Sequence, residues 1–167
     1  MEGPVKRNPR LRGCLDKGVW SILLTMPADF LNHCQTIEEC YEFSLSYAAQ
    51  GHATDKGSAQ GRQLRDQLSR ALAAIRGLEA CTASALASGS FEPRETYQVF
   101  FDVLARDARD SAAAVELVLA QPAIGSQLID NLNASTHLRA LLTGLFLAAE
   151  IFEAHQARAA GEQHEIG

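Results

Sequence analysis

The chain has 167 residues, which is the length of a single domain. Its 27 Ala and 21 Leu residues far outnumber its 13 Val and Ile residues, and this balance favours helices over a large sheet. Hydrophobic residues make up 47% of the chain, which excludes global disorder. The net charge of −5 argues against a dedicated nucleic-acid binder, and no apolar run reaches the length of about 18 residues that a membrane span needs.

The N-terminal region differs in charge from the rest of the chain. Residues 1–17 carry a net charge of +3, whereas the remaining 150 residues carry −8. Pro, Gly and basic residues fill residues 1–13, which we interpret as a flexible basic arm. No apolar segment precedes Cys14, and the apolar run after it lacks a small-residue cleavage site, so we expect no secretory signal. The expected location is the cytoplasm.

The residue types that hold metals are not arranged for that purpose. No two of the four cysteines form a Cys-x-x-Cys pair, and no His lies at zinc-finger spacing from them. The chain also lacks the Glu-x-x-His pairs of di-iron bundles. We therefore expect no metal and no cofactor, and we interpret the cysteines as free thiols in an intracellular protein. They are Cys14, Cys34, Cys40 and Cys81.

The first predicted helix covers residues 14–26 and ends at Pro27, because Pro cannot continue a helix interior. Phe30 and Leu31 are assigned to a short linking turn after it.

Residues 36–49 are ambiguous between helix and strand. Thr36 and Glu39 fit a capping box, which is typical of a helix start. Apolar residues then alternate with polar ones, as in a strand, at Tyr41, Phe43, Leu45 and Tyr47. We favour the helix, because the chain offers no second alternating segment to pair with a strand.

Residues 50–61 contain three glycines and are predicted to form a loop, with Thr54, Asp55 and Ser58 as candidate helix caps. His52 and Asp55 could pair as imidazole and carboxylate, but we interpret this loop as solvated.

The clearest pattern in the chain is a long helical hairpin. Residues 59–87 carry a heptad seam at Leu64, Leu68, Ala71, Ile75, Leu78, Thr82 and Ala85. The outward side of this helix is assigned to Arg62, Arg65, Asp66 and Arg70. A second helix over residues 92–121 follows, with Ser90 as its cap and Pro93 in its first turn. Its seam is Tyr97, Phe100 or Phe101, Leu104, Ala108, Ser111, Val115 and Val118. Because the linker is short, the two helices should pack antiparallel.

Two further helices are predicted after Pro122. The first is short and contains Ile124, Leu128 and Leu132. The seam of the last helix is Leu138, Leu142, Leu145, Ala149, Phe152 and Gln156. Residues 140–149 carry no charge on any side, which is typical of the central helix of a bundle or of a subunit interface. Residues 161–167 are interpreted as a polar tail that frays.

Together these elements predict an all-α fold. The expected architecture is an elongated antiparallel bundle of four to five helices, built around the hairpin of residues 59–87 and 92–121. Residues 14–160 form its single domain. The residues expected to pack in its core, or in an oligomer seam, are Leu64, Leu68, Ile75, Leu78, Leu142, Leu145 and Phe152.

Long helical seams without buried chemistry favour a non-catalytic interaction module, which binds another protein or a second copy of itself, with a homodimer expected. The alternative is a ligand-binding or sensor bundle that takes a small molecule. In either case the candidate binding residues are the aromatic side chains Trp20, Phe30, Tyr41, Phe43 and Tyr47.

A second alternative comes from a resemblance near the C-terminus. Arg158 and His164 are separated by five residues. This spacing resembles the Arg and His signature of HEPN-type ribonucleases, which are small dimeric helical bundles. The resemblance covers seven residues and implies cleavage of an RNA backbone by Arg158 and His164 at a dimer interface.

Overall fold

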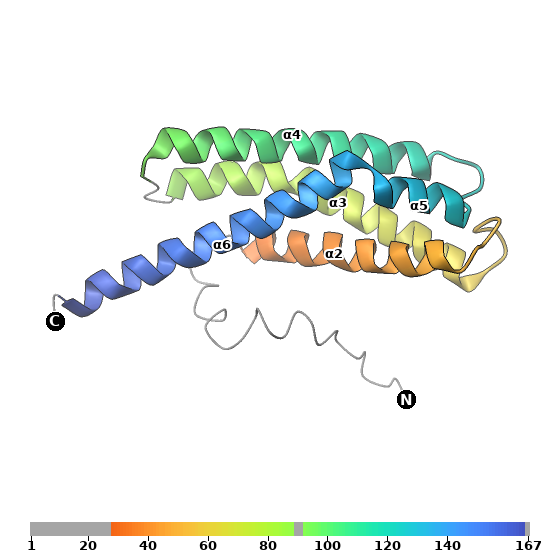
Figure 1. Ribbon diagram of the computed structural model, residues 1–167, viewed down its shortest axis with the longest axis horizontal. Coiled ribbons are helices and arrows are strands. Elements are labelled where there is room, and N and C mark those ends of the chain that lie inside the picture. The colour runs from red at the N-terminus through yellow and green to blue at the C-terminus, as the bar shows by residue number, and fades with distance from the viewer. Residues whose placement is uncertain (1–27, 89–91, 166–167) are drawn as a thin grey trace, which may run out of the picture.

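The computed structural model describes residues 28–88 and 92–165, and for residues 152–165 it describes the helical backbone alone (Figure 1). The described residues form five helices and no strand. The helices are α2 (Ala28–Ala49), α3 (Ala59–Ser88), α4 (Arg94–Leu119), α5 (Ser126–Ala134) and α6 (Thr136–Glu165). The predicted all-α fold is therefore confirmed. The apolar helix predicted over residues 14–26 lies outside the described residues, as does Ser90.

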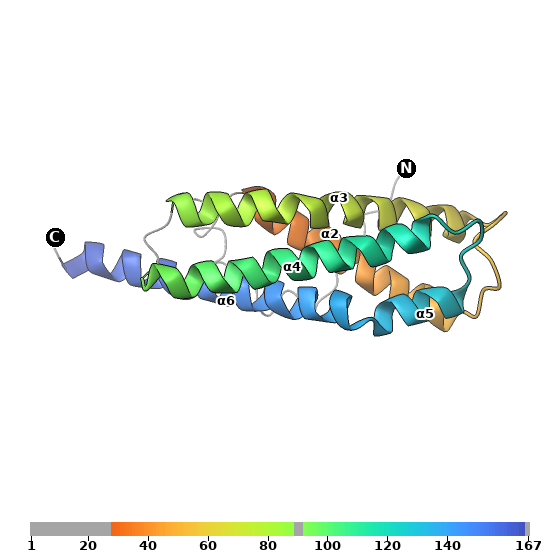
Figure 2. The same cartoon turned by 90° about the horizontal axis from the view of Figure 1, so that it is seen from above.

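The helices form an elongated antiparallel bundle around the α3–α4 hairpin (Figure 1). α2 packs on α3 and α5, whereas α6 packs on α4. The bounds of α3 and α4 lie within two residues of the predicted hairpin. Figure 2 shows α6 running antiparallel to α4 and continuing past the end of the hairpin. No described helix combines the length and the apolar character that a membrane crossing requires.

The bundle core follows the heptad pattern of the sequence. All seven seam residues of α3 are buried, from Leu64 to Ala85. In α4 the seam passes through Phe101 rather than Phe100, because Phe101 precedes Leu104 by three residues and Ala108 by seven. Phe100 lies half-buried beside it.

The strand alternative for residues 36–49 is wrong, and so is the linking turn at Phe30 and Leu31. α2 begins at Ala28 and buries residues at helical spacing, which are Phe30, Cys34, Ile37, Cys40, Ser44 and Tyr47. Tyr41 and Phe43 lie half-buried on either side of this row. The apparent alternation therefore comes from a wide apolar face on one helix.

Helix ends differ from the prediction in two places. α4 begins at Arg94, with Pro93 as its N-cap and no side-chain cap hydrogen bond. α6 continues as a helix to Glu165 instead of ending near residue 160. The tail predicted for residues 161–167 is therefore helical through Glu165.

Candidate functional site

The predicted aromatic binding residues are brought to the core instead of to a pocket. Phe30 and Tyr47 are buried, and Tyr41 and Phe43 are half-buried against the same core. The enclosed void that Tyr41 borders has a volume of about 10 Å³, which leaves room for one water molecule at most. Trp20 lies outside the described residues. These side chains therefore contribute to stability, and none of the described ones lines a ligand-sized cavity.

The predicted seam residues lie inside a single bundle. The six whose side chains are described, Leu64, Leu68, Ile75, Leu78, Leu142 and Leu145, are all buried in one core. The side chain of Phe152 lies outside the described part. A second chain is therefore not needed to cover these six residues.

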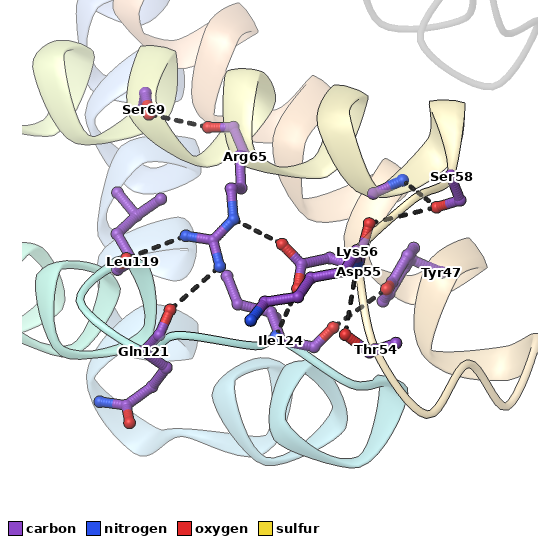
Figure 3. Close-up of polar contacts among 11 residues, drawn as sticks. Tyr47, Thr54, Asp55, Lys56, Ser58, Arg65, Ser69, Leu119, Gln121 and Ile124 are labelled. Atoms are coloured by element: carbon purple, nitrogen blue, oxygen red, sulfur yellow. Dashed lines mark hydrogen bonds and ion pairs between the residues drawn. The ribbon is translucent and has the colours of Figure 1, made fainter.

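An ion pair between a buried carboxylate and a half-buried guanidinium lies at one end of the bundle (Figure 3). Asp55 is only 5% exposed, and its Oδ2 accepts a hydrogen bond from Nε of Arg65 over 2.5 Å. Its Oδ1 accepts a hydrogen bond of 2.7 Å from the backbone N–H of Ile124. The guanidinium of Arg65 also donates to the backbone carbonyls of Leu119 (3.1 Å) and Gln121 (3.0 Å). The pair thus ties the 50–58 loop and α3 to the end of α4.

Both members of this pair contradict the sequence interpretation. The sequence predicts a solvated loop around Asp55 and an outward position for Arg65 on its helix. Arg65 follows the buried Leu64, and its long side chain reaches carbonyls at the C-terminal end of α4, which lack partners within the helix. Once Arg65 is placed there, a carboxylate beside it is needed to balance the charge.

Hydrogen bonds extend the cluster to α2 and α5. Tyr47 Oη donates to the carbonyl of Ile124 over 3.1 Å. Ser126 Oγ donates to the carbonyl of Tyr47 (2.7 Å) and accepts from the backbone N–H of His52 (2.8 Å). The His52 ring contacts Gln50 rather than Asp55, so the two residues do not form an acid–base pair. Because these polar groups are occupied by one another, the cluster is structural.

The charge state of Asp55 is set by its partners. Burial alone would raise the pKa of this carboxyl, but hydrogen bonds from Arg65 and from the Ile124 N–H outweigh it and lower the pKa below its ordinary value. Asp55 is therefore ionised at neutral pH and pairs with a cationic Arg65.

The described thiols are inert. Burial, with a further contribution from Glu38, raises the pKa of Cys34 to about 12. Burial also raises the pKa of Cys40 to about 11. It raises the pKa of Cys81 as well. Because the thiolate is the nucleophile, none of these three cysteines is suited to attack a substrate. Among the described residues, no group of three or more His, Cys, Asp or Glu side chains could hold a metal ion.

A surface of a different kind lies on the outside of α4 and α6. Four large apolar side chains, each between 46 and 58% exposed, are found there: Val99, Val103, Phe146 and Leu147. We call these four residues the α4–α6 apolar face. The segment of residues 140–149 was expected to be the buried centre of a bundle or a subunit interface. The first of these interpretations is wrong, because four of the ten residues are exposed.

The relative position of the two helices follows from two contacts. His137 of α6 lies 3.8 Å from Asp110 of α4. One heptad further along each helix, Gly144 packs so closely on α4 that an added Cβ would lie 2.8 Å from Leu104. Because Val103 precedes Asp110 by seven residues, it lies on the same side of α4, next to α6. Leu147 follows Gly144 by three residues and lies about 60° from it around the axis of α6, on the side toward α4. Phe146 lies about 160° from Gly144 and points away from α4, on the outer side of α6.

Comparison with protein-family models, with curated proteins and with solved structures found no match to this chain. The assignment of a function therefore depends on the surface and the chemistry described above.

Proposed function

We propose that this protein is a non-catalytic interaction module that binds a protein partner through the α4–α6 apolar face. The observation that carries the proposal is the outer side of α6. Residues 140–149 carry no charge, although Phe146 and Leu147 are about half exposed to solvent. A surface helix of a monomeric protein normally places charged residues on its outer side. Large exposed apolar side chains on an uncharged helix segment are typical of a docking surface.

The contrast with the rest of the bundle supports the proposal. The outer side of α3 carries Arg62, Asp66 and Arg70, all of them exposed. The middle of α4 likewise exposes Arg106 and Arg109. These are ordinary solvated helix surfaces, whereas the α4–α6 apolar face is the exception. Leu45 and Leu117 are also exposed. Leu45 lies on α2 beside α5, and Leu117 lies at the C-terminal end of α4, fourteen residues beyond Val103, so neither belongs to the face.

The alternatives receive less support. An internal ligand would need a cavity far larger than the void of about 10 Å³ at the centre of the bundle, and the hollow of about 500 Å³ between α2 and α5 is open to solvent. Arg158 and His164 both fall on the backbone of α6, where they differ by six positions and thus by about 120° around the helix axis. The resemblance to a ribonuclease signature covers seven residues only, and no match to a known family or solved structure extends it.

The test is purification of the tagged full chain from its own host in three forms. Phe146→Asp places a charge in the face, and Leu45→Asp is the matched control, since Leu45 is equally apolar and similarly exposed. We expect a defined partner that remains bound to the wild type and to Leu45→Asp but is lost from Phe146→Asp. Partners that are retained equally by all three forms, or lost equally from both variants, would contradict the proposal.

A further inference from the structure

We propose that the occupant of the α4–α6 apolar face is a second copy of this chain, bound with its α6 antiparallel to the first. This inference rests on the proposed function and names its partner. It is carried by the pattern of charge on the outer side of α6.

The outer side of α6 has a seam of its own. Arg139, Thr143, Phe146 and Glu150 follow one another at intervals of four, three and four residues, and all are exposed. Opposite charges therefore stand at the two ends of the seam, about 16 Å apart, with Thr143 and Phe146 between them. The same side of the helix thus carries a cation at one end and an anion at the other.

Such a seam is complementary to itself only when two copies run antiparallel. A twofold axis that passes between residues 144 and 145 places Arg139 of each copy opposite Glu150 of the other. The same axis places Phe146 of each copy opposite Thr143 of the other, so that a large side chain meets a small one. A parallel arrangement would instead place like charges together at both ends.

The charged side chains at the two ends of the seam are available to pair with a second chain. Among the described side chains the ion pairs are Asp55 with Arg65, Arg76 with Glu116, and Asp110 with His137, so neither Arg139 nor Glu150 takes part in one. The hydroxyl of Thr143 donates to the carbonyl of Arg139 over 2.9 Å. Because this hydroxyl is already satisfied, Thr143 can present its methyl group to an apolar partner.

The size of the surface sets the expected affinity. Two helices packed over a few turns bury less than the roughly 800 Å² per partner of a typical stable interface. Leu147 borders the seam on the side toward α4 and should be partly covered, whereas Val99 and Val103 lie on α4 and stay outside this contact. We therefore expect a reversible dimer with a dissociation constant of about 10 µM.

Sedimentation equilibrium of the purified full chain, kept reduced, tests this arrangement. We expect wild-type protein to shift with concentration from the chain mass of 18.1 kDa to twice that mass. Phe146→Asp should weaken dimerisation about 100-fold or more, whereas Leu45→Asp should leave it unchanged. Arg139→Glu and Glu150→Arg should each weaken it roughly 5- to 10-fold, because each places two like-charged pairs across the twofold axis.

The double variant Arg139→Glu with Glu150→Arg decides the orientation. It restores both ion pairs with reversed sign only in the antiparallel arrangement, so its affinity should return to within about twofold of wild type. Failure of this rescue would overturn the antiparallel arrangement. A dimer that is insensitive to Phe146→Asp would overturn the assigned surface.

A wild-type chain that stays monomeric up to about 100 µM would overturn self-association altogether. That failure is distinguishable from failure of the proposed function. A partner from the host that is lost on Phe146→Asp and retained on Leu45→Asp would then show that a different protein occupies the face. Cross-links from position 146 to residues 14–26 of the same chain would show instead that the chain covers its own surface.

Discussion

Nε of Arg65 lies 2.5 Å from the carboxylate of Asp55, ten residues earlier in the chain, and this pair joins the loop after α2 to the end of α4. Replacing Asp55 removes the counter-charge of Arg65, whose side chain is 34% exposed, and changes the acceptor of the buried Ile124 N–H. Asp55→Asn should therefore lower the free energy of unfolding by about 1–3 kcal/mol, measured by urea denaturation. Asp66→Asn, on the exposed side of the same hairpin arm, is the control and should change it by less than about 0.5 kcal/mol. Equal effects of the two substitutions would contradict the role assigned to Asp55.

The same pair predicts how stability depends on pH. Hydrogen bonds from Arg65 and Ile124 lower the pKa of Asp55 in the folded state despite its burial, whereas an unfolded chain titrates near the ordinary value of about 3.9. The unfolded state therefore takes up the proton first as the pH falls. The stabilisation from Asp55 is fully present above about pH 4 and is lost as the pH drops through the folded pKa.

Urea denaturation of wild type and Asp55→Asn across this range checks the prediction. The difference in unfolding free energy between the two proteins should be constant from pH 7 to about pH 5 and should shrink at lower pH. A difference that grows as the pH falls would show that Asp55 is protonated in the folded state.

Thiol reactivity tests the packing of α2 against α3. In a Cys14→Ser variant the remaining thiols are Cys34, Cys40 and Cys81, all buried and all with raised pKa values. They should react with an aromatic disulfide reagent at pH 8 only at the rate of local or global unfolding. The same variant in denaturant should release three equivalents at once. Rapid reaction of any of the three in the folded protein would contradict the burial described for it.

Two neighbouring residues test the orientation of α6. Leu145 is buried in the core and Phe146 points outward, although the two are adjacent in the chain. Leu145→Ala should lower the free energy of unfolding by about 2–5 kcal/mol. Phe146→Ala should lower it by less than about 1 kcal/mol when the protein is dilute enough to be monomeric. Reversed magnitudes would mean that α6 is rotated from the position described here.

Much of the fold could be predicted because it depends on periodicity. The heptad seam from Leu64 to Ala85 is buried along its whole length, and the bounds of the hairpin follow from Pro93, Pro122 and the heptad pattern. The alternation at Tyr41 and Phe43 resembles a strand, but both residues are half-buried beside the buried row of a single helix.

The polar cluster could not be predicted in the same way. Asp55 and Arg65 carry no shared motif, and they meet only because the loop folds back over the start of α3. An Arg directly beside a seam residue, with an acidic residue in the preceding loop, is a weak signal that many solvated helices also show. The α4–α6 apolar face had a clearer signal in the uncharged residues 140–149, but sequence alone did not tell which side of that segment faces the core.

Photo-cross-linking from position 146 in living cells is the decisive test of the interaction surface. A photoreactive phenylalanine analogue replaces Phe146 in the full chain, and the same analogue at Leu45 serves as the control. We expect a defined intermolecular product from position 146, of twice the chain mass if the occupant is a second copy, and none from position 45. Exclusive reaction of position 146 with water, under conditions in which the chain is folded, would contradict the claim that the α4–α6 apolar face is an interaction surface.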